Sequence, residues 1–145
     1  MRIHIKNGRL VDPATGKDGP GDLYVDEGRI VERLKSPERT IDAKGLVVAP
    51  GFIDLSARLR EPGFEYKATL ESEMEAAVAG GVTSLACPPD TDPPLDEPGL
   101  VDMLRRRALS LERSRVYPLG ALTMKLEGKA LTEMAELAEA GCVAF

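Results

Sequence analysis

A change in hydrophobic period near residue 51 is the feature that most constrains the fold of this chain. From Gly51 onward, short apolar runs alternate with longer segments in which apolar residues recur at helical spacing. The apolar runs stand at 51–55, 82–87, 115–120 and 142–145. Strands that alternate with helices are typical of a parallel sheet covered by helices. We therefore predict an α/β fold for residues 51–145.

Three segments between these runs are predicted to be helices. The first has Thr69 as its N-cap and ends at Gly80-Gly81. We expect Asp96 to cap the second helix, and we expect the third to run from about Leu131 to Gly141. The predicted inner face of the second helix consists of Leu100, Val101, Leu104, Ala108 and Leu111.

The first fifty residues follow a different pattern, in which short strands are separated by turn residues. Asn7-Gly8 stands between two strand-like runs and is typical of a type I′ hairpin. Glu27-Gly28 and Lys44-Gly45 mark two further turns. We predict that residues 1–50 form a small antiparallel β-module that precedes a second domain at 51–145.

The second domain holds elements for about the first three and a half units of a larger α/β fold. Its last apolar run, 142–145, meets no turn or cap. A parallel strand without a neighbour leaves an open hydrogen-bonding edge, and a (β/α)8 barrel needs roughly 200 residues or more. We expect the N-terminal part of a TIM-type barrel. The chain would then be a fragment, with the remaining strands in a second chain or in a segment outside this sequence.

Composition and charge argue against several classes of partner. Charged residues make up 30% of the chain and are interspersed in sign, and the net charge is -5. Nucleic acid and anionic membranes require a clustered basic face, so we expect neither as a partner. The chain shows neither a signal peptide nor an apolar stretch of about 18 residues, so we expect a cytoplasmic location. Cys87 and Cys142 are expected to be buried free thiols.

Polar residues follow the first strand of the predicted sheet, where active sites collect in α/β proteins. Ser56 and Arg58 are two residues apart, so an extended strand would place them on the same face. A hydroxyl is a poor ligand for a transition metal, and a guanidinium is cationic and has no lone pair to donate. A serine hydrolase would need a histidine base, and the only histidine is His4, in the first strand-like run.

The stretch APGFIDLSARLREPGFEYKATLESEMEAAVAGGVTSLACPPDTD, residues 49–92, resembles the start of the dihydroorotase barrel in the amidohydrolase superfamily. The family pattern is Asp-x-His-x-His-x-Arg-x-Pro-Gly, then Gly-Gly-x-Thr, then Pro-Asn-Thr. The resemblance covers the whole chain, but only the front third of the family's usual length. The scaffold residues of the pattern that are retained are Asp54, Pro62, Gly63, Gly80, Gly81 and Thr83.

The resemblance implies that the working residues of the site have changed. Arg60 matches the arginine that binds the substrate carboxylate, whereas Asp90 stands where the family has a substrate-binding asparagine. Ser56 and Arg58 occupy the places of two zinc-binding histidines. We therefore expect a vestigial substrate site at Arg60 and Asp90, with no catalytic residue, no metal ligand and no cofactor, although active relatives use zinc. We also expect Arg58 to neutralise remaining carboxylates and Arg60 to pair with Asp90.

Three functions remain open at this stage. Residues 77–96 and 116–145 resemble inactive dihydroorotase homologues that act as structural partners of aspartate transcarbamoylase in pyrimidine biosynthesis, which implies a homo- or hetero-oligomer. The alternative is an active zinc-dependent cyclic amidohydrolase whose atypical metal site is completed by residues beyond 145. A third possibility is a dihydropyrimidinase-related scaffold protein, which the Leu-Arg-Glu-Pro-Gly run at 59–63 makes less favoured.

Overall fold

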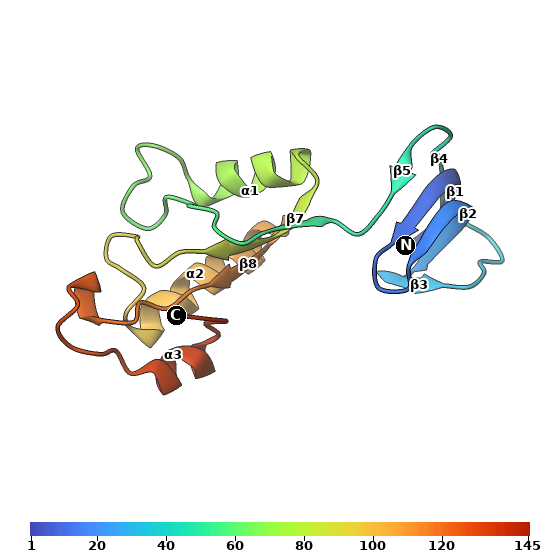
Figure 1. Cartoon of the computed structure of the whole chain (residues 1–145). Coiled ribbons are helices and arrows are strands. Elements are labelled where there is room, and N and C mark those ends of the chain that lie inside the picture. The colour runs from blue at the N-terminus through green and yellow to red at the C-terminus, as the bar shows by residue number, and fades with distance from the viewer. The chain divides into compact units, whose positions relative to one another are not determined.

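The computed structural model describes all residues from 1 to 145, and the chain divides into two compact units, Met1–Pro50 and Gly51–Phe145. Figure 1 shows a small all-β unit at the N-terminus and a mixed unit of strands and helices in the rest of the chain. No helix combines the length and the apolar character that crossing a membrane requires.

The N-terminal unit is a five-stranded mixed sheet. Its strands are β1 (Arg2–Asp12), β2 (Lys17–Asp26), β3 (Arg29–Val31), β4 (Arg39–Asp42) and β5 (Val47–Val48). The order is β3-β2-β1-β4, and β5 also pairs with β1. β2 is antiparallel to β1 and to β3, but β4 and β5 run parallel to β1. The prediction of a purely antiparallel module was therefore wrong for the last two strands, whereas the turn at Glu27-Gly28 is confirmed.

Asn7-Gly8 is an irregularity within one strand. β1 continues through it, and the register with β2 shifts between Ile5 and Gly8. Asn7 has a φ of 63°, its backbone N–H donates to Asp22 Oδ1 at 3.0 Å, and its Nδ2 donates to Asp42 Oδ1 at 3.1 Å. The predicted hairpin was wrong because carboxylates from β2 and β4 bind Asn7 and hold the strand in a bulge.

The second unit is a three-stranded parallel sheet with helices, which confirms the predicted α/β class. Its strands lie in the order β6 (Phe52–Asp54), β7 (Val82–Cys87) and β8 (Arg115–Pro118). The helices are α1 (Leu70–Ala79), α2 (Pro98–Leu111), the 3-10 turn η1 (Met124–Leu126) and α3 (Met134–Ala140). The apolar run 142–145 contributes one isolated parallel bridge, between Leu119 and Ala144.

Helix capping and core packing in this unit follow local sequence signals. Thr69 Oγ1 accepts a 3.2 Å hydrogen bond from the Ser72 N–H, and the reciprocal bond of a capping box is present. The sheet and helices share one core, whose fully buried side chains include Leu59, Leu70, Met74, Leu85, Leu95, Val101, Leu104 and Leu137. Three of the five predicted inner-face residues of α2 are buried, and the other two pack against the same core.

Two helix starts differ from the predictions. α2 begins at Pro98 after Glu97, because Asp96 is buried and its Oδ2 accepts the Lys125 N–H at 2.7 Å instead. α3 begins at Met134, so Leu131 lies outside the helix and is 65% exposed. The first difference arises from a contact between the loops after β7 and β8. At the second, Leu131 instead forms an isolated antiparallel bridge with Thr123, within the segment that follows β8.

Candidate functional site

The first strand end carries Ser56 and Arg58 on a bend. β6 stops at Asp54, whose Oδ1 accepts a 2.9 Å hydrogen bond from the Ser56 N–H. The chain returns to β7 at Ala57, whose N–H donates to the Ala86 carbonyl at 2.9 Å. Because the strand has already ended, alternation along an extended strand does not govern Ser56 and Arg58. The reasoning that placed these two side chains on one face therefore does not hold.

Arg58 forms an ion pair with Asp90 from the second strand end. Arg58 Nε donates to Asp90 Oδ2 at 2.7 Å, and the two side chains are 52% and 43% exposed. The carboxylate raises the pKa of Arg58 above its ordinary value, through the hydrogen bond first and the charge second. The expectation that Arg58 would lie against a carboxylate is confirmed. The expected pair between Arg60 and Asp90 was wrong, because Asp90 is bound by Arg58.

Arg60 lies on the loop that leads from β6 to α1. Its φ of 64° is in the left-handed region, and its carbonyl accepts the Phe64 N–H at 2.8 Å, which closes a turn. Arg60 takes part in none of the ion pairs of the structure. Of the two residues of the predicted vestigial substrate site, Arg60 therefore has no carboxylate partner, whereas Asp90 is paired with the Arg58 guanidinium.

Glu61 anchors this loop to two helices, a role that the sequence reasoning missed. Its Oε2 accepts the Leu70 N–H at the start of α1, and its Oε1 accepts from Arg107 Nε in α2, both at 2.9 Å. The Glu61 side chain is only 17% exposed. An acidic side chain at a helix N-terminus is favourable, but no local pattern announces a partner 46 residues away.

The two loops also contact each other at Gly63. Gly63 has a φ of 97°, and a Cβ atom placed there would overlap the backbone of Asp92. The Asp92 N–H donates to the Pro62 carbonyl at 3.1 Å. The glycine of the Pro-Gly pair therefore permits close approach of the loops that carry Arg58 and Asp90.

Little free space remains between these loops. The cavity between them has a volume of about 10 Å³ and is lined by Arg58, Leu59, Arg60, Phe64, Cys87, Pro88, Asp90 and Thr91. Small-molecule sites usually enclose roughly 300–1,000 Å³, so this space holds about one water molecule. The structure brings Arg58, Arg60 and Asp90 around one cavity, but Ser56 does not line it. Ser56 lines a separate groove beside α1, of about 310 Å³.

The donor set at these strand ends does not fit a zinc ion. Zinc sites use thiolate, imidazole and carboxylate ligands. Ser56 and Arg58, which occupy the histidine positions of the family pattern, carry a hydroxyl and a guanidinium instead. The Asp54 and Asp90 carboxylates accept from Ser56 N–H and Arg58 Nε. No three His, Cys, Asp or Glu side chains are grouped so that they could hold a metal ion.

Cys87 is one of the residues that line the small cavity. Its side chain is 1% exposed, and burial raises the pKa of the Cys87 thiol to about 11. Cys142 is also buried, and both thiols are free, as predicted. A buried thiol with a raised pKa is a weak nucleophile at neutral pH, so Cys87 belongs to the packing of the site.

Comparison with protein families matches residues 45–145 to the family described as "Dihydro-orotase-like". A protein of Pseudomonas putida called "Dihydroorotase-like protein" is 49% identical over all of this chain and 35% of its own length. A protein of the same name from Pseudomonas aeruginosa is 46% identical, over 36% of its own length. The Aquifex aeolicus protein called "Dihydroorotase" is 42% identical, over 35% of its length. The chain thus spans about a third of the length of these relatives.

Solved structures show the same fold. The "L-Hydantoinase (Dihydropyrimidinase) from Arthrobacter aurescens" superposes on 99% of this chain with a TM-score of 0.80 and 24% sequence identity, and the match covers 32% of that chain. A D-hydantoinase superposes on 99% of this chain with a TM-score of 0.55 and 19% identity. At these identities the comparison establishes the fold alone, that of the N-terminal part of an amidohydrolase TIM barrel.

Proposed function

Because this chain belongs to the dihydroorotase-like family, we propose that it is part of a non-catalytic dihydroorotase homologue of pyrimidine biosynthesis. The complete protein would act as a structural partner of aspartate transcarbamoylase, in a homo- or hetero-oligomer. A cytoplasmic location accords with that pathway. The chain covers about a third of its relatives, so activity and partner are proposals for the whole protein.

One observation carries the proposal: Arg58, at a position where the family pattern has a zinc-binding histidine, is bound to Asp90 at 2.7 Å. A zinc ion would be repelled by the guanidinium. At a given distance this repulsion is about twice as strong for a dication as for a single positive charge. Asp90 also brings a negative charge to the place of a substrate-binding amide, which opposes the binding of an acidic substrate.

The structural role is supported by what the family pattern retains. Pro62 and Gly63 of the pattern persist and let the first loop approach Asp92. Beside them, Glu61 fixes that loop to α1 and α2. The scaffold residues of the pattern are retained, whereas the metal-ligand positions have changed. This combination favours a binding function over catalysis. Two of the relatives carry the name "Dihydroorotase-like protein", which is compatible with this proposal.

The test uses the complete protein, of which this chain is part, purified without added metal. Elemental analysis should find substoichiometric zinc, and neither dihydroorotate nor carbamoyl-aspartate should turn over above background. Sedimentation with the aspartate transcarbamoylase of the same organism should show a complex larger than either protein alone. Stoichiometric zinc together with turnover would overturn the non-catalytic proposal, and the absence of a complex would overturn the partner proposal.

The alternative function is an active zinc-dependent amidohydrolase with an atypical metal site completed by residues beyond 145. Its support is that relatives at 41–44% identity, including the Aquifex aeolicus protein, are called "Dihydroorotase". In that case an Arg58→Ala variant, which removes a cation from the site, should bind zinc more tightly and turn over faster than the unchanged protein. No gain in either quantity would contradict the alternative.

A further inference from the structure

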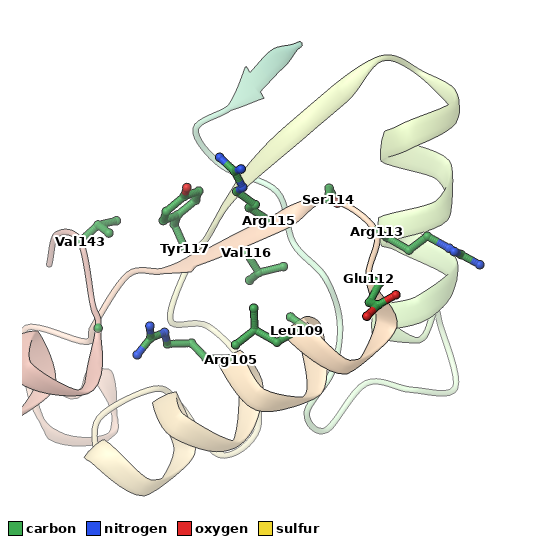
Figure 2. A pocket seen from close by; sticks show the side chains of 11 residues that line it. Arg105, Leu109, Glu112, Arg113, Ser114, Arg115, Val116, Tyr117 and Val143 are labelled. Carbon is green, nitrogen blue, oxygen red and sulfur yellow. The ribbon is translucent and has the colours of Figure 1, made fainter. Parts of the chain in front are cut away.

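A second cavity in residues 51–145 shares no lining residue with the cavity between the strand-end loops. It lies between α2 and β8 and has a volume of about 420 Å³. Figure 2 shows Val116 of β8 and Leu109 of α2 directed into the space between the strand and the helix. This volume falls in the range of roughly 300–1,000 Å³ that is usual for small-molecule sites.

The walls of this cavity are apolar and partly open to solvent. Ala108, Leu109, Val116 and Val143 contribute side chains to it, and Leu109 and Val143 are 72% and 57% exposed. Covering such surface with an apolar group is favourable, because it removes the surface from water. The cavity is therefore suited to the apolar body of a ligand.

The lining carries an excess of positive charge. Arg105, Arg113 and Arg115 line the cavity beside one acidic residue, Glu112. None of these four residues takes part in an ion pair of the structure. Figure 2 shows Arg113 and Arg115 directed away from the space between β8 and α2, so Arg105 is the cation available to an anion in the cavity.

Of the three arginines that line the cavity, Arg105 is held in place by a hydrogen bond to the backbone. Its Nη1 donates to the Ala140 carbonyl at 2.5 Å, and its guanidinium occupies the space where a Cβ atom of Gly141 would lie. The remaining N–H groups of the guanidinium are free to bind a carboxylate. Figure 2 shows Arg105 at one end of the cavity, whereas Arg113 points away from it.

A buried hydroxyl without a partner lies at the other end. Ser114 is 6% exposed, and its Oγ is buried with no hydrogen-bond partner. Leaving a buried hydroxyl unpaired costs free energy. Figure 2 shows Ser114 on the side of the cavity opposite Arg105. A polar group of a ligand at this end would satisfy it.

We propose that this cavity binds an elongated organic carboxylate. The carboxylate binds Arg105, the apolar body packs between Val116 and Leu109, and a hydroxyl or carbonyl at the far end bonds to Ser114. This site is independent of the proposed partner function, because it uses none of the residues of the Arg58–Asp90 region.

The probe is 6-hydroxyhexanoate, which carries a carboxylate, an apolar chain and a terminal hydroxyl. Saturation-transfer NMR with the complete protein should show saturable binding of this probe. Its amide, 6-hydroxyhexanamide, and the cation 6-aminohexanol should bind at least about tenfold more weakly, because each lacks the charge that Arg105 recognises. No saturable binding, or equal binding of all three compounds, overturns the proposal.

Three variants locate the site. Arg105→Gln should weaken binding at least about tenfold. Because Arg105 also binds the Ala140 carbonyl, the exposed Leu109→Glu is the second variant, and it should weaken binding similarly by adding a negative charge to the wall. Arg106→Gln is the matched control, since Arg106 lies on the same helix, is 82% exposed and pairs with Asp102. The assignment to this cavity is overturned if Leu109→Glu leaves binding unchanged. It is also overturned if Arg106→Gln weakens binding as much as Arg105→Gln does.

Discussion

Arg58 Nε donates a 2.7 Å hydrogen bond to Asp90 Oδ2, across 32 residues of sequence. The pair joins the loop after β6 to the loop after β7, and it stands where the family pattern places a metal ligand and a substrate-binding amide. Each charge therefore has its counterion within the protein. Under the proposed non-catalytic function, this ion pair takes the place of a metal ligand and a substrate-binding group.

We expect this ion pair to contribute little to stability. Both side chains are about half exposed, and surface pairs are weakened by solvent and by salt. Arg58→Ala and Asp90→Asn should each shift the thermal midpoint of unfolding by no more than about 2 °C. Differential scanning calorimetry at low and at 1 M salt measures this. A large loss in either variant would show that the pair holds the loops together.

Glu61 should matter more than the Arg58–Asp90 pair. Its carboxylate is 17% exposed and binds both the Leu70 N–H and Arg107. Glu61→Ala should lower the free energy of unfolding by about 1–3 kcal/mol, because a buried donor at the start of α1 loses its acceptor. Urea denaturation measures the loss. Arg106→Ala, which removes an exposed pair at 3.6 Å, is the control and should change stability by less than about 0.5 kcal/mol.

Local signals made much of the second unit predictable. Thr69, the apolar positions of α2 and Gly141 act within a few residues of the backbone they control, so their effect is visible in sequence. Buried thiols at Cys87 and Cys142 followed from the apolar runs around them.

Long-range contacts were not predictable. Asn7-Gly8 suits a hairpin or a bulge, and the choice depends on carboxylates from β2 and β4. We expected Arg60 to pair with Asp90, but Arg58 binds it, after a bend at the end of β6 that the sequence pattern did not reveal. The role of Glu61 required knowledge of where α2 lies.

The bulge at Asn7 leads to a prediction about two carboxylates. The pKa of Asp42 lies below its ordinary value chiefly because of the Asn7 side chain, whereas that of Asp22 lies below chiefly because of the Asn7 backbone N–H. Asn7→Gly removes only the side chain and suits the positive φ. NMR titration should therefore show the pKa of Asp42 rising towards 3.8, with that of Asp22 almost unchanged. An equal rise at both residues would contradict the assigned hydrogen bonds.

Gly63 should be intolerant of a side chain. Gly63→Ala requires a Cβ atom at a φ of 97° and in the space that Asp92 occupies. Gly128→Ala is the matched control, because Gly128 also has a positive φ, 72°, but no atom lies near its Cβ position. Both variants carry backbone strain of about 1–2 kcal/mol, and only Gly63→Ala adds a steric clash. Chemical denaturation should find Gly63→Ala the less stable of the two, and equal losses would argue against close contact of the loops.

The buried thiol of Cys87 should make stability fall at alkaline pH. Burial raises its pKa from 9.0 to about 11 in the folded protein. Below pH 9 the thiol is protonated in both states, so it has no effect on stability. Between pH 9 and 11 the unfolded chain releases the proton while the folded chain retains it, which favours unfolding by up to about 3 kcal/mol. The free energy of unfolding, measured by denaturation between pH 9 and 11, should therefore fall less steeply with pH in Cys87→Ala than in the unchanged protein. A second measurement is the reaction of Cys87 with iodoacetamide at pH 9, followed by peptide mapping. Cys87 should react far more slowly in the folded protein than in the unfolded protein, because its thiolate fraction is small when it is buried. Equal rates would contradict its burial.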